Sequence, residues 1–228
     1  MALLLFLELV FFIAVRNSVD LLRKLEGFTS VAPQMPILEY AYWKFAAALL
    51  LLVWLKARGA RLSDYGFRNL GSIWLFLLIA FAAVAVSIVV PGIVDQMLEA
   101  YFGKTPVLSR FAALKGDLLL FLFILPFVWL FAAFGEEFFY RGFVLENLRR
   151  ILGGGAFATV IAIVAQGAMF GAAHSYQGPA GMISIAIGGT LLGFLYWAGG
   201  RRLWPMILAH GIVDTLGLYA IYSGLMAT

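Results

Sequence analysis

Long apolar runs, separated by short polar segments, make up most of the chain. A helix needs about 20 residues to cross the roughly 30 Å of hydrocarbon in a bilayer, so each run of that length predicts a membrane span. The first run is shorter, and either spans with help from its flanks or lies partly in the interface. The predicted spans cover residues 2–15, 37–55, 70–94, 117–135, 155–174, 179–198 and 203–223.

A separate helix over residues 134–151 would raise the number of helices to eight. The pattern therefore predicts an all-α fold, a polytopic membrane helix bundle of about 7–8 helices. The sequence contains no repeat, low-complexity segment or shift in composition that would mark a domain boundary. We expect residues 1–228 to form a single membrane-embedded domain.

The composition supports a membrane location. Hydrophobic residues make up 64% of the chain and charged residues only 12%, whereas a soluble domain has roughly 25% charged residues. The net charge of +4 is modest, and its basic residues cluster at span ends, where they suit anionic lipid headgroups. No basic, aromatic-rich segment indicates nucleic-acid binding. We expect an integral, multi-pass protein of a prokaryotic cell membrane, with the lipid bilayer as a partner and its oligomeric state open.

The chain contains no cysteine, which excludes disulfides, thiolate metal sites and a cysteine nucleophile. Its N-terminal run has no basic start and carries Glu8, so we interpret it as a retained helix and not as a signal peptide. Segments 56–69, 136–153 and 199–204 hold nine Lys and Arg, against six in 16–36 and 95–116. By the positive-inside rule, this difference favours a cytoplasmic location for segments 56–69, 136–153 and 199–204. Because nine and six are close, the topology stays open.

The sequence FGEEFFYRGF places two carboxylates and an arginine at the end of an apolar run. Glu137 and Arg141 are four residues apart, so they stack on one helix face with the acid first, which is the favourable order. Glu136 points about 100° away and has Tyr140 as its own neighbour one turn later. The spacing predicts an internal Glu137–Arg141 pair that leaves Glu136 to face another group. The alternative is that all three residues form one structural salt-bridge cluster.

The chain has two histidines, His174 and His210, and Asp214 follows His210 by one helical turn. If residues 117–151 form one helix bent near Pro126, and 153–155 is the turn to the next span, Glu136 and His174 lie roughly 25 and 28 Å from that turn. His210 and Asp214 join them only if the 149–155 turn protrudes further than the 200–202 turn. The sequence therefore permits one shared polar site.

Two G-x-x-x-G patterns occur close to these residues. Gly167 and Gly171 precede His174, and Gly189 and Gly193 lie in the following span. Small residues at this spacing let membrane helices approach closely. We expect these glycines to be packing residues.

A carboxylate and two histidines in a half-dry site suit one kind of chemistry. A glutamate shielded from water can act as a general base near neutral pH and activate a water molecule beside a histidine. A second histidine can donate to the oxyanion that forms when that water attacks a carbonyl. This describes hydrolysis of a peptide or ester without a covalent intermediate. The sequence has no H-E-x-x-H zinc helix, no G-x-S-x-G elbow and no partner for Asp214 in an aspartyl dyad.

Three short motifs carry a resemblance to a known family. They are E-E-x-x-x-R, F-x-x-x-H and H-x-x-x-(N or D), and they begin here at Glu136, Phe170 and His210. In these motifs the chain resembles the family of CAAX proteases and bacteriocin-processing enzymes (CPBP), also called the Abi family of intramembrane glutamate endopeptidases, which is related to the CAAX prenyl protease 2 type. The resemblance covers a catalytic core of about residues 117–223.

The resemblance implies a bundle of about eight helices with an intramembrane catalytic cavity and no metal or cofactor. By the same resemblance, Glu136 looks like the base that activates water, assisted by His174. His210 and Asp214 look like the residues that stabilise the oxyanion, and Glu137 and Arg141 look like the supporting pair.

Asp214 stands where the prenyl-protein branch of the family has asparagine, which supplies a donor. A carboxylate donates a hydrogen bond only when it is protonated. We therefore expect Asp214 to accept a hydrogen bond from His210 and to orient that ring.

These observations predict an intramembrane glutamate endopeptidase that cleaves a membrane-associated peptide or protein near the membrane surface. One alternative is a non-catalytic immunity or scaffold protein that binds a peptide or protein in the membrane. Another is a proton-coupled transporter, since buried Glu and His also form proton relays. The absence of an internal repeat in the sequence counts against a transporter.

Overall fold

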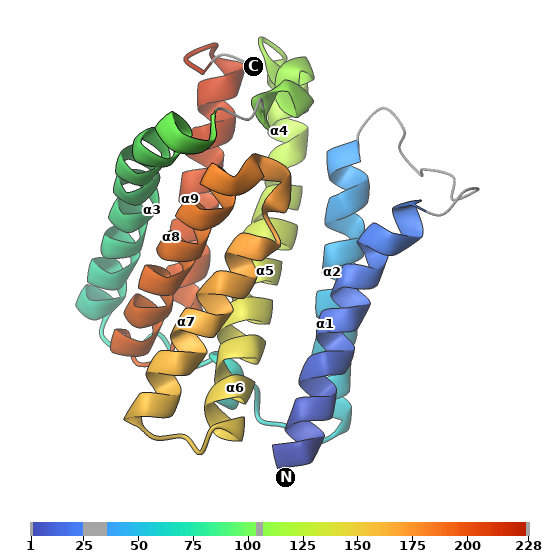
Figure 1. The fold of residues 1–228 in the computed structure, drawn as a ribbon, viewed down its shortest axis with the longest axis vertical. Helices are drawn as coiled ribbons and strands as arrows, with labels where there is room; N and C mark the ends of the chain where they lie inside the picture. Colours follow the sequence, from blue (N-terminus) through green and yellow to red (C-terminus); the bar gives the residue numbers. More distant parts are fainter. Residues whose placement is uncertain (1, 25–35, 104–106, 227–228) are drawn as a thin grey trace.

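The computed structural model describes residues 2–24, 36–103 and 107–226, with side chains for residues 2–16, 45–103 and 111–226. Seven long helices run through these parts of the chain, and the fourth is built from several consecutive segments (Figure 1). The α-helices are α1 (Ala2–Lys24), α2 (Pro36–Ala57), α3 (Ile73–Phe102), α4 (Leu118–Phe127), α5 (Gly135–Glu137), α6 (Glu146–Ile151), α7 (Ala156–Ala172), α8 (Gly178–Ala198) and α9 (Leu203–Tyr222). Short 3₁₀ helices are η1 (Leu62–Tyr65), η2 (Val107–Leu114) and η5 (Ser175–Gln177), and π-helical segments are η3 (Val128–Phe134) and η4 (Phe138–Leu145).

Residues Leu118–Ile151 form one continuous helix, here called the central helix, which joins α4, η3, α5, η4 and α6. The sequence predicted a long helix over these residues, and it is present. The alternative prediction of a separate helix over residues 134–151 is wrong, because the backbone stays helical through Gly135. The central helix begins at Asp117, whose side chain accepts a hydrogen bond from Leu120 N at 2.9 Å and caps the first turn.

The central helix changes its winding beyond Pro126, where the sequence predicted a bend. Proline has no N–H to continue the α-helical ladder, and the chain turns π-helical from Val128. A second π-helical segment begins at Phe138, so the short α-helical turn that carries both glutamates lies between two wider segments. π-Helical turns inside α-helices occur frequently at functional sites.

Four helices in the described residues are long and apolar enough to cross a membrane: Ile73–Phe102, Leu118–Ile151, Ser175–Ala198 and Leu203–Tyr222. Residues Phe45–Ala57 and Ala156–Ala172 form shorter apolar helices. Large apolar side chains cover the outside of the bundle; Trp74, for example, is 78% exposed. Such a surface is typical of a protein that faces lipid. The chain is an integral membrane protein.

Helices α7 and α8 approach closely, as the glycine pattern predicted. A Cβ atom built on Gly171 would lie 2.8 Å from Ala186 N, and one on Gly167 would lie 2.8 Å from Thr190 N. On the other helix, a Cβ on Gly189 would lie 3.0 Å from the ring of Phe170. The two backbones can reach this separation only because these positions have no side chain.

One end of the bundle, here called the basic end, is formed by residues 56–72, 146–155 and 199–202. Ion pairs with a buried carboxylate connect its segments. Glu146 accepts hydrogen bonds from Arg201 Nε at 2.5 Å and from Tyr196 Oη at 3.2 Å. Burial alone would lower the pKa of Arg201, but the hydrogen bond and the negative charge of Glu146 outweigh burial and raise that pKa. Arg150 Nη2 donates to Asp64 O at 2.8 Å, so the end of the central helix is joined to η1.

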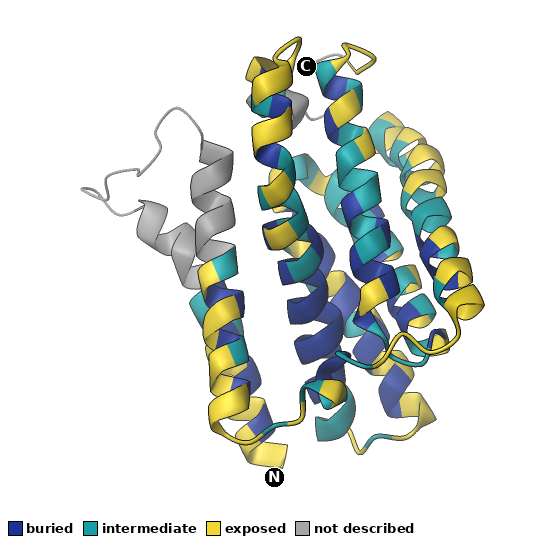
Figure 2. Ribbon diagram, turned by 180° about the vertical axis from the view of Figure 1, so that it is seen from behind, coloured by how far each residue is buried: buried dark blue, intermediate teal, exposed yellow. Residues whose placement is uncertain are grey.

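The core lies around the lower half of the central helix. Figure 2 shows the buried residues gathered there and on the neighbouring helix faces, with exposed residues on the outer surfaces. The fully buried side chains on this stretch include Phe138, Phe143, Val144 and Leu145. The two glutamates are therefore held on the best-packed helix of the described structure.

Candidate active site

The two adjacent glutamates face different partners. Glu137 Oε1 accepts a hydrogen bond from Arg141 Nη1 at 3.0 Å, one turn along the central helix. The Arg141 side chain is 0% exposed and its guanidinium also lies 4.6 Å from the centre of the Phe170 ring. The internal Glu137–Arg141 pair predicted from the spacing is present, and Glu136 points elsewhere.

His210 is bound by Glu137. Its Nδ1 lies 2.9 Å from Glu137 Oε1, the same oxygen that Arg141 holds. Because the carboxylate is paired with an arginine, it is the acceptor, and Nδ1 of His210 carries the proton. The sequence had suggested no contact between Glu137 and a histidine.

Asp214 lies on the other side of the same ring. Its Oδ2 is 3.5 Å from His210 Nε2, which is longer than the usual range of an N–H···O hydrogen bond. The sequence predicted that Asp214 orients His210 by accepting a hydrogen bond, but the short contact to this ring comes from Glu137. Asp214 supplies a negative charge close to the second nitrogen.

Glu136 faces His174. The carboxylate is 5% exposed, and its Oε2 lies 4.0 Å from His174 Nε2. His174 Nδ1 lies 2.8 Å from the carbonyl oxygen of Phe170. A carbonyl can only accept, so Nδ1 carries a proton, and in the neutral ring Nε2 is an acceptor.

The Phe170 ring connects the two halves of the site. Its centre is 4.7 Å from the ring of His174, 6.4 Å from the ring of His210 and 4.9 Å from the ring of Tyr140. Phe170 thus packs between the histidines, while its backbone fixes one of them. The structure places the four predicted catalytic residues and the two predicted supporting residues in one cluster.

A further residue of the cluster comes from α1. Arg16 Nη2 lies 3.9 Å from Glu136 Oε1, and the guanidinium lies 4.8 Å from the centre of the Tyr140 ring. The sequence reasoning missed Arg16 and counted it, like Arg141, with the basic residues at span ends. Both side chains are buried, so neither bears on the orientation of the chain. The only signal in the sequence was an arginine directly after the first apolar run.

The cluster brings together three carboxylates, two arginines and two histidines. Within the parts of the chain that the structure describes, no three His, Asp or Glu side chains are grouped closely enough to hold a metal ion. The groups present can move a proton and stabilise charge at a carbonyl.

The predicted site residues lie in a region that matches a known protein family. Residues 118–216 match the model of the family described as Type II CAAX prenyl endopeptidase Rce1-like. Over these residues, here called the Rce1-like region, the chain is similar to the Rce1-like family. The Rce1-like region contains every predicted site residue from Glu136 to Asp214, whereas Arg16 lies outside it. At the level of the family, this match supports a CAAX-type intramembrane protease.

Comparisons with individual proteins add no closer relative. Neither the search of curated proteins nor the search of solved structures found a significant match to the chain.

Proposed function

We propose that the chain is an intramembrane glutamate endopeptidase that hydrolyses a peptide bond of a membrane-associated peptide or protein. The observation that carries this proposal is the pair of acceptors formed by Glu136 Oε2 and His174 Nε2, 4.0 Å apart. That separation is too long for a direct hydrogen bond. One water molecule can donate a proton to each acceptor across such a gap.

The first step is attack by this water on the carbonyl carbon of the scissile peptide bond. As the new C–O bond forms, one proton of the water passes to Glu136, which acts as the general base. His174 accepts the second hydrogen bond and keeps the lone pair of the oxygen directed at the substrate. The Phe170 carbonyl holds the ring of His174 in the tautomer that this role needs.

The carbonyl oxygen of the substrate becomes negatively charged in the tetrahedral intermediate. We assign the stabilisation of this oxyanion to His210. Its Nδ1 donates to Glu137, and when the ring is protonated its Nε2 is a second donor that can bind the oxyanion. Asp214 lies close to that nitrogen and offsets the charge of the imidazolium. A donor aimed at an oxyanion contributes about 10²–10³ to the rate in known hydrolases.

The intermediate collapses when the C–N bond breaks. Glu136 returns the proton that it took from water to the departing amine nitrogen, so the products are a carboxylic acid and an amine, and the acid then passes its proton to the amine or to solvent. No covalent enzyme intermediate forms, and the carboxylate of Glu136 is restored for the next turnover.

The family name adds a candidate for the substrate class, since the model describes prenyl endopeptidases. We propose a membrane-associated peptide or protein with its scissile bond near the membrane surface. A prenylated C-terminal peptide belongs in the test set beside unprenylated membrane-anchored peptides.

The test is cleavage of a library of membrane-anchored peptides, prenylated and unprenylated, by the purified protein. Glu136→Gln is run in parallel, because it keeps the shape and hydrogen bonding but removes the base, and chelator is added to both. We expect cleavage by the wild type with or without chelator and none by Glu136→Gln. Equal cleavage by both proteins would contradict the proposal. Tight binding of a peptide without cleavage would favour the scaffold alternative, and pH-driven flux in proteoliposomes would favour the transporter.

A further inference from the structure

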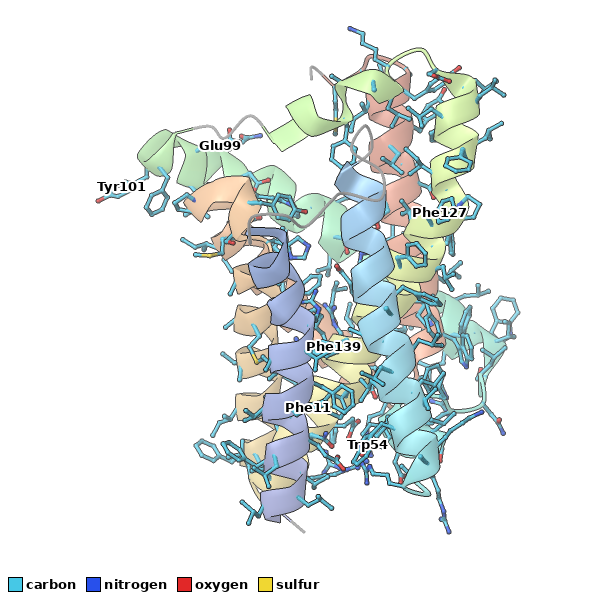
Figure 3. The ribbon with its side chains drawn as sticks, turned by 90° about the vertical axis from the view of Figure 1, so that its right-hand side faces the viewer. Phe11, Trp54, Glu99, Tyr101, Phe127 and Phe139 are labelled. Atoms are coloured by element: carbon cyan, nitrogen blue, oxygen red, sulfur yellow. The ribbon has the colours of Figure 1, made fainter. Side chains whose placement is uncertain are left out.

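Helix α1 reaches the site although it lies outside the Rce1-like region. Arg16 is 8% exposed, and its guanidinium is held over the rings of Phe139 and Tyr140, 5.2 and 4.8 Å from their centres. Both rings belong to the central helix and lie two and three residues after Glu137. Figure 3 shows Phe139 projecting between α1 and α2.

The buried guanidinium has one described carboxylate within reach, Glu136, at 3.9 Å. Arg16 Nη2 is itself buried and makes no hydrogen bond within the described part of the chain. A buried charge is costly in an apolar bundle unless an opposite charge lies close by. The position of Arg16 is therefore explained by the negative charge of Glu136 and by the two aromatic faces beneath it.

A cation close to Glu136 makes two adjacent carboxylates less costly. The neighbouring carboxylate, Glu137, has its own arginine, Arg141, at 3.0 Å. Arg16 reduces the repulsion between the charge of Glu136 and the like charge next to it. At 3.9 Å the contact with Arg16 is an interaction between charges and not a hydrogen bond, so it uses no lone pair that the base needs for water.

We propose that Arg16 is a positioning residue for the reaction, which holds the Glu136 carboxylate ionised and directed at His174. This inference rests on the proposed function of Glu136 as the base. It assigns part of the site to α1, which makes the N-terminal helices a component of the proteolytic machinery and not only a scaffold around it.

The structure also offers a control for the docking of α1. Glu8 lies two turns before Arg16 on the same helix, and its Oε1 is 3.1 Å from Arg58 Nε and 3.3 Å from Trp54 Nε1. Figure 3 shows Trp54 on α2 beside α1. Glu8→Gln weakens the docking of α1 without changing any charge at Glu136.

The experiment measures kcat, KM and thermal unfolding for the full-length wild type, Arg16→Lys, Arg16→Met and Glu8→Gln, with a peptide that the wild type cleaves. Arg16→Met keeps a long apolar side chain and removes the charge. We expect it to lower kcat at least about tenfold with little change in KM, because the effect is on the base. Arg16→Lys should recover part of the loss, and Glu8→Gln should lower thermal stability while keeping kcat.

Three results would overturn the proposal: a wild-type kcat in Arg16→Met, a loss confined to KM, or the same loss of kcat in Glu8→Gln. The failure of the proposed function is recognised separately, since in that case Glu136→Gln itself cleaves like the wild type.

Discussion

His210 Nδ1 lies 2.9 Å from Glu137 Oε1, which also holds Arg141 at 3.0 Å. One carboxylate oxygen therefore joins a residue of α9 to the central helix. The second glutamate of the E-E-x-x-x-R motif is thus more than a partner for its arginine, because it sets the proton and the orientation of a histidine on another helix.

Glu137→Gln tests this relationship. We expect a fall in kcat of at least roughly 10–100-fold, the range found for acids that orient a metal-bound histidine. Thermal stability should fall as well, because Arg141 would be left buried without its acid, which costs about 3–5 kcal/mol. Cleavage assays and unfolding in detergent measure the two effects.

The double variant Glu137→Gln with Arg141→Met separates them. Removing both charges should restore much of the stability, since no unpaired buried charge remains. It should not restore kcat, because His210 still lacks its acceptor. Recovery of activity together with stability would show that Glu137 acts only through folding.

Asp214 can be tested by changing its charge and its polarity separately. Asp214→Asn keeps a polar group close to His210 Nε2 and can donate to an oxyanion, so we expect kcat to stay within about tenfold of the wild type. Asp214→Leu removes both functions and should cost about a hundredfold. Equal and large losses in both variants would show that the negative charge itself is needed.

Close packing of α7 on α8 holds His174 in place, so Gly171→Ala should disturb the site from a distance. The added methyl group would meet backbone atoms of α8, including Ala186 N at 2.8 Å. We expect a loss of about 1–3 kcal/mol in stability, as for other overpacked sites, and a lower kcat. Gly188→Ala is the matched control on α8, because a Cβ there meets nothing within 4 Å. It should leave both quantities unchanged or raise stability slightly.

Substitution of Glu146, at the basic end, should change the stability of the protein without changing the chemistry of the site. Glu146→Gln would leave Arg201 and Arg149 without their acid, and we expect a loss of about 3–5 kcal/mol. Because the pKa of Arg201 is raised, this arginine stays charged over the whole range of pH in which the protein can be assayed. The activity of the folded fraction should equal that of the wild type, and a specific loss of kcat would contradict this view.

Local spacing predicted much of the site. Glu137 and Arg141 pair because residues four apart meet on one helix face, and that relation depends on nothing outside the segment. The apolar runs predicted the helices to within a few residues at most ends, although α3 continues past Asp95 to Phe102. Similar heights along neighbouring helices suggested that Glu136 and His174 could meet, and they lie 4.0 Å apart.

Contacts between helices that are distant in the sequence could not be predicted from the sequence alone. The pattern of α1 does not show which helix Arg16 faces, so its approach to Glu136 depends on packing alone. The choice of Glu137 and not Asp214 as the close partner of His210 depends on how α9 is rotated against the central helix. The π-helical segments also escaped prediction, because the periodicity of an entirely apolar stretch does not distinguish them from α-helix.

The winding of the central helix also determines how a change in its length is absorbed. A π-helical turn holds one residue more than an α-helical turn, and η4 lies between the glutamates and the buried anchor at Glu146. Deleting one residue from Gly142–Leu145 would let this stretch close into an ordinary α-helix. Because one α-helical turn would then replace one π-helical turn, the glutamates would keep nearly the same rotation relative to Glu146. Such a deletion would remove none of the six predicted site residues and would leave both carboxylates facing their histidines, whereas a deletion in an entirely α-helical stretch would turn them by about 100°.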